Sequence, residues 1–224
     1  MRTGPGEPND RTWQRTSLAG LAGSLAGRRV VAVDGRGASG KTSLARRLAE
    51  HTGATVVHSD DVAWNHSRFD WDEQMISGVL TPYLAGTGVH YQPPGWASHG
   101  RDGHITVAAD AALLIIEGVG VSRRSLVPYL DVAIWVRSDY ADAKRRGLER
   151  DMAEQGTDHA TAERLWDEWE AEEVPFLQDD RPWERADVIV GAVPETPELR
   201  YDPSTEVLIG AGPGSYTPPG PTPS

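Results

Sequence analysis

One segment of the sequence has the glycine and lysine spacing of a phosphate-binding loop. Residues 30–43 read VVAVDGRGASGKTS, which contains the pattern GxxxxGK[ST] between a β-branched run and a helix-like segment. Glycines let backbone N–H groups turn toward phosphate oxygens, and the following helix start adds free donors. The lysine of such a loop reaches the outer phosphates. The predicted nucleotide-binding residues are Gly35, Gly37, Ala38, Ser39, Gly40, Lys41, Thr42 and Ser43. No guanine-specific motif is evident, so ATP is the expected nucleotide.

A second polar group follows the apolar run ALLIIEG at residues 112–118. Glu117 comes directly after large apolar residues, at the edge of a dry core, where a carboxylate is costly without a cation or a donor. In phosphate loops the Thr hydroxyl and an acidic residue from a neighbouring strand hold Mg²⁺. We therefore expect Thr42 and Glu117 to bind Mg²⁺. The alternative is an ordinary charged strand end.

An acidic and aromatic stretch, HSDDVAWNHSRFDW, occupies residues 58–71. Asp60 and Asp61 follow a second apolar run, so they should lie at the same edge of a sheet as the phosphate loop. Phosphoryl transfer to an alcohol needs a carboxylate that orients the hydroxyl and takes its proton. One aspartate suits this role, and the other suits a cap on the next helix or turn.

Apolar runs alternate with helix-like segments along most of the chain. Strands are predicted at residues 28–35, 54–58, 112–118, 131–136 and 186–191, and helices at 17–27, 41–53, 72–86, 140–156 and 161–177. This alternation indicates a three-layer α/β fold with a mainly parallel central sheet flanked by helices. Ligands of such sheets bind at the carboxyl ends of the strands. Residues 89–107 are predicted to form a small hairpin or flap.

The ends of the chain differ in composition from its middle. Residues 1–12 are expected to be disordered, and residues 194–224 to form a Pro- and Gly-rich mobile tail in which only EVLIG looks strand-like. Residues 13–193 then form one domain, with an acceptor-binding insert at 64–107 and a lid at 152–162.

The net charge of −11 argues against a nucleic-acid partner, because phosphate backbones demand a basic surface. No segment resembles a secretory signal or a membrane span, so we expect a soluble, cytoplasmic protein without a membrane partner. The chain has no cysteine. A homo-oligomer is compatible with the sequence.

The order and approximate spacing of several motifs resemble the uridine kinase-like branch of P-loop kinases, which includes uridine/cytidine kinases, nicotinamide riboside kinases and phosphoribulokinase-like enzymes. The segments are GRGASGKTS, HSDD, FDW, GVHYQPPGW, IIEG, ERD and ADVIV, within residues 29–191. The resemblance implies a P-loop NTPase-type fold. It also implies that Asp60 is the catalytic base and that Arg150 neutralises charge on the phosphates beside Lys41.

The same resemblance implies a set of acceptor-binding residues. Asp70 matches an aspartate that binds ribose hydroxyls, Trp96 an aromatic residue near the nucleobase, and Arg101 a basic residue on the acceptor side. His99, close to Arg101, could hydrogen-bond a base edge or a hydroxyl. Phe69 and Tyr91 belong to the same motifs and complete the predicted acceptor side.

The chain also departs from this family. Gln155 stands where the lid would carry an arginine, and Gly147 replaces an expected arginine in the preceding helix. Trp166 and Trp169 add aromatic bulk, which ordinary packing on one helix face explains best. These departures suggest a reshaped acceptor pocket.

Three functions remain open at this point. The leading hypothesis is an ATP- and Mg²⁺-dependent kinase acting on the 5′-hydroxyl of a nucleoside. The second is a kinase acting on a non-nucleoside alcohol, such as an antibiotic or a specialised metabolite. The third is a nucleotide-dependent regulatory ATPase, which would have no need of Asp60 and Asp70.

Overall fold

The computed structural model describes residues 2–9, 12–192 and 199–211. A seven-stranded sheet has the order β1–β9–β8–β7–β2–β6–β3, and β4 and β5 form a separate hairpin. The strands are β1 (Gln14–Ser17), β2 (Val30–Gly35), β3 (Thr55–His58), β4 (Val89–Tyr91), β5 (Ile105–Val107), β6 (Leu114–Glu117), β7 (Val132–Ser138), β8 (Val188–Ala192) and β9 (Glu206–Ala211). The pairs among β8, β7, β2, β6 and β3 are parallel, which confirms the predicted sheet.

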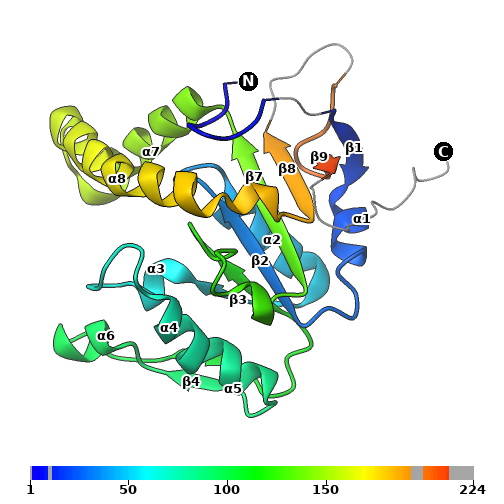
Figure 1. Cartoon of the computed structure of the whole chain (residues 1–224), viewed down its shortest axis with the longest axis vertical. Coiled ribbons are helices and arrows are strands. Elements are labelled where there is room, and N and C mark those ends of the chain that lie inside the picture. Colours follow the sequence, from blue (N-terminus) through cyan, green and yellow to red (C-terminus); the bar gives the residue numbers. More distant parts are fainter. Residues whose placement is uncertain (1, 10–11, 193–198, 212–224) are drawn as a thin grey trace.

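Helices cover both faces of this sheet. They are α1 (Leu18–Gly23), α2 (Lys41–Thr52), α3 (Ser59–Val62), α4 (Asp72–Met75), α5 (Thr81–Leu84), α6 (Pro94–Ser98), α7 (Tyr140–Gln155) and α8 (His159–Asp180). A π-helical segment, Ile76–Leu80, joins α4 to α5, and short 3₁₀ turns lie at Val127–Tyr129 and Pro182–Glu184. Figure 1 shows α7 and α8 together at one end of the chain's fold, with the insert of α4, α5, α6 and β4 at another. The predicted lid, residues 152–162, corresponds to the end of α7, the turn that follows it and the start of α8.

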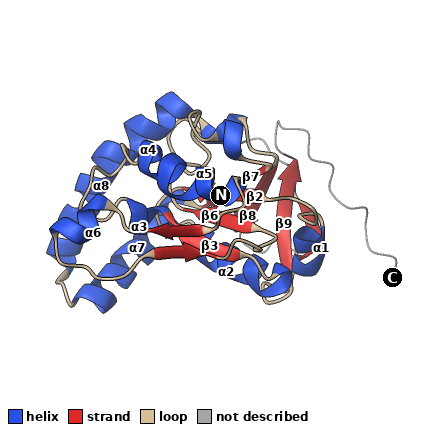
Figure 2. Cartoon of the chain, turned by 90° about the horizontal axis from the view of Figure 1, so that it is seen from below, coloured by secondary structure: helices blue, strands red, loops and turns tan. Residues whose placement is uncertain are grey.

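The alternation of side chains along β2 explains the two cores. Val31 and Val33 pack with Leu21 of α1 and Leu44 of α2 on one face of the sheet. The intervening side chains of β2 face the opposite way and join a second core with α4, the π-helical segment and α5. Figure 2 shows α2 and α4 on opposite sides of the strands. The fold therefore has the three layers that the sequence predicts.

The N-terminal segment differs from the prediction of disorder over residues 1–12. Glu7 is buried and accepts hydrogen bonds from the Trp135 indole at 2.7 Å and from Arg137 Nε at 2.6 Å. Its carboxylate also lies 3.8 Å from Arg36 of the phosphate loop. The prediction is wrong for residues 2–9, because the Glu7 carboxylate between buried arginines anchors this segment although its composition is typical of disorder. Residues 1, 10 and 11 lie outside the described part.

The predicted mobile tail at 194–224 also needs correction. Residues 206–211 form β9, which pairs antiparallel with both β1 and β8 and is therefore an internal strand of the sheet. Val207, Leu208 and Ile209 are buried there. The tail prediction failed for this segment because EVLIG supplies a strand whose partners are distant in sequence. Residues 193–198 and 212–224 lie outside the described residues.

None of the helices in the described part of the chain combines the length and the apolar composition that crossing a bilayer requires.

Asp139 caps the N-terminus of α7 and ties it to the start of the chain. Its carboxylate accepts hydrogen bonds from the backbone N–H groups of Ala141 and Asp142 and, at 2.6 Å, from that of Arg2. The bond from Arg2, followed by those of the helix, lowers the pKa of Asp139, while its slight burial acts in the opposite direction. We expect Asp139→Ala to lower the free energy of unfolding by about 1 kcal/mol at neutral pH.

This loss should depend on pH in a defined direction. A carboxyl whose pKa is lower in the folded state stabilises the fold above its unfolded pKa, and this contribution is lost as the pH falls through the folded pKa. Urea denaturation of wild type and Asp139→Ala should therefore differ at neutral pH and converge well below the ordinary pKa of 3.8. An equal difference at both pH values would contradict this role of the charge.

Candidate active site

The phosphate loop runs from the end of β2 into the start of α2, as predicted. Gly40 precedes α2 with a φ of 101°, and no side chain caps that end of the helix. The first N–H groups of an α-helix lack partners within the helix, so those of residues 41–43 suit an anion. A Cβ at Gly35, where φ is 154°, would lie 2.4 Å from the carbonyl oxygen of Val136, so only glycine fits there. This loop has the form that phosphate binding requires.

Lys41 and Ser39 place further donors in the loop. The Lys41 side chain is buried, and its Nζ donates to the backbone oxygen of Arg36 at 2.8 Å. The Ser39 hydroxyl is buried and has no hydrogen-bond partner among the described residues. A buried donor without a partner is costly, which fits a site that an anion completes.

Thr42 and Glu117 converge where Mg²⁺ is predicted to bind. The Thr42 hydroxyl donates to Glu117 Oε1 at 3.2 Å. Glu117 on β6 is opposite His58 on β3, and His58 Nδ1 lies 2.6 Å from Glu117 Oε2. The hydrogen bond to Glu117 raises the pKa of His58, while burial lowers it. The Thr42 hydroxyl and a Glu117 carboxylate oxygen lie close together and are suitable Mg²⁺ ligands, and the contact with His58 orients the carboxylate.

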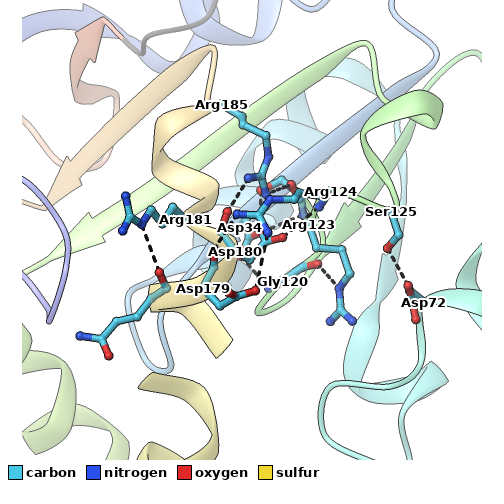
Figure 3. A network of polar contacts seen from close by, with 12 residues as sticks. Asp34, Asp72, Gly120, Arg123, Arg124, Ser125, Asp179, Asp180, Arg181 and Arg185 are labelled. Atoms are coloured by element: carbon cyan, nitrogen blue, oxygen red, sulfur yellow. Dashed lines mark hydrogen bonds and ion pairs between the residues drawn. The ribbon is translucent and has the colours of Figure 1, made fainter. Parts of the chain in front are cut away.

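Asp34 holds the loop that follows Glu117. It is fully buried on β2 and accepts hydrogen bonds from the hydroxyl and N–H of Ser122 and from the N–H of Gly120. Burial raises the pKa of Asp34, while these hydrogen bonds lower it. Figure 3 shows Asp34 and Gly120 close to the Asp180–Arg185 ion pair, whose arginine also donates to the Ser122 carbonyl. Asp34 is not among the predicted site residues, although an acid within an apolar strand was an available signal.

Five of the eight predicted nucleotide-binding residues and the predicted base line one cavity of about 410 Å³, whereas Gly35, Ser39 and Ser43 are not part of its lining. Its lining includes Gly37, Ala38, Gly40, Lys41, Thr42, Asp60, Glu117 and Arg150. Asp60 lies on α3, directly after β3, and its side chain is exposed. Asp61 instead pairs with Arg101 at 2.6 Å. Of the two adjacent acids, Asp60 is therefore the one that opens toward the phosphate loop.

A smaller cavity of about 170 Å³ adjoins the first beside Asp60. The two share Asp60, Arg68, Val119 and Trp169 in their linings. Asp70 is exposed, accepts a hydrogen bond from the Ser67 hydroxyl at 2.8 Å, and lines neither cavity. Phe69 stacks on Phe176 of α8 with ring centroids 4.5 Å apart. Their predicted contacts with an acceptor stay predictions.

The flap residues Trp96, Arg101, His99 and Tyr91 line neither of these two cavities. Trp96 is buried, and its indole donates to the backbone oxygen of Asp61 at 2.8 Å. The Arg101 guanidinium lies 3.7 Å from the centroid of the Trp96 ring. His99 is exposed, and the Tyr91 hydroxyl donates to Gln74 at 3.5 Å. A nucleobase could reach the ring of Trp96 only if Arg101 moved, so this contact also stays a prediction.

Helix α7 contributes two arginines to the phosphate side. Arg150 lines the 410 Å³ cavity and bonds to Asp151 at 2.8 Å. Arg146, one turn earlier, donates to the backbone oxygen of Ala38 in the loop at 3.1 Å. Arg146 is not among the predicted site residues, although its spacing of four residues from Arg150 places both on one helix face.

Helix α8 covers the phosphate loop, and this contact was not predicted from the sequence. Trp166 packs so closely on α7 that a Cβ at Gly147 would lie 2.0 Å from its ring. The glycine that replaces an expected arginine therefore makes room for a tryptophan. Trp169 lies over Gly37, with its Nε1 at 3.1 Å from the position of a Cβ there. Both tryptophans pack as expected, and they also line the cavity.

No protein-family model matches the chain, and no curated protein matches it either. Among solved structures, the chain is similar to one described as a possible uridine kinase from Bacillus stearothermophilus, with 22% identity and a TM-score of 0.46 over 77% of this chain and 96% of that chain. It is also similar to a kinase assigned to a fructose transport system from Silicibacter sp. TM1040, with 21% identity and a TM-score of 0.42 over 66% of this chain and 86% of that chain.

Proposed function

We propose that the chain is an ATP- and Mg²⁺-dependent small-molecule kinase that transfers the γ-phosphoryl group to an alcohol. The observation that carries the proposal is a single cavity in which an exposed carboxylate, Asp60, shares the lining with Lys41 and Thr42 of the phosphate loop. A regulatory ATPase needs the loop but has no need of a carboxylate placed to receive a proton from an acceptor.

In this proposal each residue has a defined role. Lys41 and the loop N–H groups hold the phosphates, and Arg150 offsets charge on the transferred group. Thr42 and Glu117 would hold Mg²⁺, which would supply positive charge to the phosphates when bound. Asp60 takes the proton of the acceptor hydroxyl while the oxygen of that hydroxyl forms a bond to the γ-phosphorus. The bond from that phosphorus to the bridging oxygen breaks, and ADP leaves with the electron pair.

The first acceptor to test is the 5′-hydroxyl of a nucleoside, which the sequence motifs support. A specific observation favours a second candidate, a smaller non-nucleoside alcohol. The cavity next to Asp60 is about 170 Å³ and is lined by Trp71 and Trp169. The Trp96 ring, predicted to contact a nucleobase, is covered by Arg101.

The test is ADP formation by the purified protein with ATP, Mg²⁺ and a panel of nucleosides and other alcohols, with the phosphorylated product identified by mass spectrometry. We expect ADP to appear only when an acceptor is present. ADP released at one rate with or without every acceptor would identify an ATPase instead. Absence of ATP binding would overturn the proposal altogether.

Replacing Glu117 with Gln should raise the Mg²⁺ concentration needed for half-maximal activity. The amide keeps the size of the side chain but removes the charge that faces the metal. Removing a group that only orients a metal ligand weakens metal affinity by about tenfold or more. Removing the charge of a ligand itself should weaken it at least as much. A Mg²⁺ titration of the activity measures this, with the exposed Glu50→Gln on α2 as the control. Equal midpoints in Glu117→Gln and wild type would remove Glu117 from the metal site.

A further inference from the structure

A carboxylate of α8 occupies a donor of the phosphate loop. The Glu173 side chain is buried, at 1% exposed, and its Oε1 accepts a hydrogen bond from the Gly37 N–H at 2.6 Å. Gly37 belongs to the loop to which the proposed function assigns the phosphates of ATP. A carboxyl group of the chain therefore occupies a donor that is suited to a phosphate oxygen.

The charged and titratable groups around Glu173 come from the loop, α7 and α8. Lys41 and Arg36 of the loop favour its ionised form, whereas burial is the largest influence and raises its pKa. From α7, Tyr140 faces it, and from α8, Glu170 accepts a hydrogen bond from the Tyr140 hydroxyl at 2.6 Å. Glu173 therefore has the cations of the loop and Tyr140 of α7 as neighbours.

The position of Gly37 identifies the phosphate that this carboxylate would meet. Trp169 lies against Gly37, and the same tryptophan lines the smaller cavity on the acceptor side, next to Asp60. A third cavity, of about 580 Å³, is lined by Arg146 and Glu154, and Gly37 is not part of its lining. The phosphate nearest the acceptor is the one that is transferred, so the Gly37 N–H is on the side of the terminal phosphate.

We infer that Glu173 competes with the terminal phosphate of ATP for the Gly37 N–H and thereby sets the affinity for ATP relative to ADP. This inference rests on the proposed function. One N–H group serves one strong acceptor at a time, and two anions close together in a partly dry site repel each other. ATP binding therefore requires Glu173 to withdraw from Gly37.

The local structure of α8 permits such a withdrawal. Pro175 lies inside the helix, two residues beyond Glu173. A proline has no N–H, so the turn that carries Glu173 lacks the hydrogen bond from residue 175 to Ala171. This turn can move with less loss of helix bonding than a regular turn.

The test compares ATP and ADP binding to wild type and Glu173→Gln by isothermal titration calorimetry, with Mg²⁺ and without acceptor. Glutamine keeps the size of the side chain and removes its charge. We expect the Kd for ATP to fall about tenfold or more, while the Kd for ADP changes by less than about twofold. The matched control is Glu168→Gln, an exposed residue of the same helix paired with Arg164; it should leave both constants unchanged.

Three outcomes would overturn the inference. The first is a Kd for ATP that stays the same or rises in Glu173→Gln. The second is a change by the same factor in the Kd values for ATP and ADP, which would indicate that Glu173 supports the loop as a whole. If Glu173→Gln does not fold, Glu173→Ala is the second variant. A ratio of the Kd for ATP to the Kd for ADP that equals the wild-type ratio in Glu173→Ala would then decide against competition. Wild type that binds neither nucleotide would refute the proposed function itself.

Discussion

Asp60→Asn is expected to lower turnover by about a hundredfold to ten-thousandfold and to leave the Kd for ATP within about twofold of wild type. Asparagine has the size of aspartate but cannot accept the proton of the acceptor hydroxyl. Asp60 is exposed, so its replacement should not disturb folding. It also lies across the cavity from the phosphate loop rather than within it, so nucleotide binding should survive.

Steady-state kinetics and calorimetry on the same preparation separate these two effects. Asp61→Asn is the matched control, because Asp61 is the next residue of α3 but pairs with Arg101. We expect this control to keep turnover within a few-fold of wild type. Unchanged turnover in Asp60→Asn would remove Asp60 as the base. Loss of ATP binding in that variant would instead mean that Asp60 supports the loop.

Glu7→Ala is expected to lower the free energy of unfolding by about 3–5 kcal/mol. The variant removes the carboxylate that accepts from Arg137 Nε at 2.6 Å, and the Arg137 side chain is 0% exposed. A buried guanidinium without its partner carries the full cost of its desolvation. The Trp135 indole loses its acceptor at the same time.

Urea denaturation followed by tryptophan fluorescence measures this loss. The double variant Glu7→Ala with Arg137→Met removes both charges and should recover much of the stability, because an apolar side chain of similar length avoids the unpaired charge. A loss below about 1 kcal/mol in Glu7→Ala would show that solvent reaches Arg137 and that the segment is held weakly.

Local sequence patterns were sufficient for the central strands and the phosphate loop. The run VVAVDG and the run ALLIIEG are apolar on both faces, and only a strand between two helical layers buries them in that way. The loop at 35–42 needs glycines at particular dihedral angles, so its residue types reveal its conformation. The placement of Asp60 after β3 followed from the same rule that ligands gather at the carboxyl ends of parallel strands.

Contacts between distant segments could not be predicted in this way. EVLIG becomes an internal strand only because residues 14–17 and β8 lie beside it. Glu7 is in a polar segment that looks disordered until its distance from Arg137 is known. Nothing in the acidic sequence of α8 indicated that Glu173 would reach the N–H of Gly37, 136 residues away.

The sequence by itself determined the layered fold, the phosphate loop and the position of the acid pair Asp60 and Asp61 after a strand, because these depend on periodicity and on backbone constraints within a few residues. The tertiary structure alone decided which acid opens to the cavity, which tryptophans line it, and which carboxylate occupies the loop. Those outcomes depend on the pairing of Asp61 with Arg101 and on how α7 and α8 pack across the sheet edge. That packing is a sum of many weak contacts between segments far apart in the chain, and no local pattern encodes it.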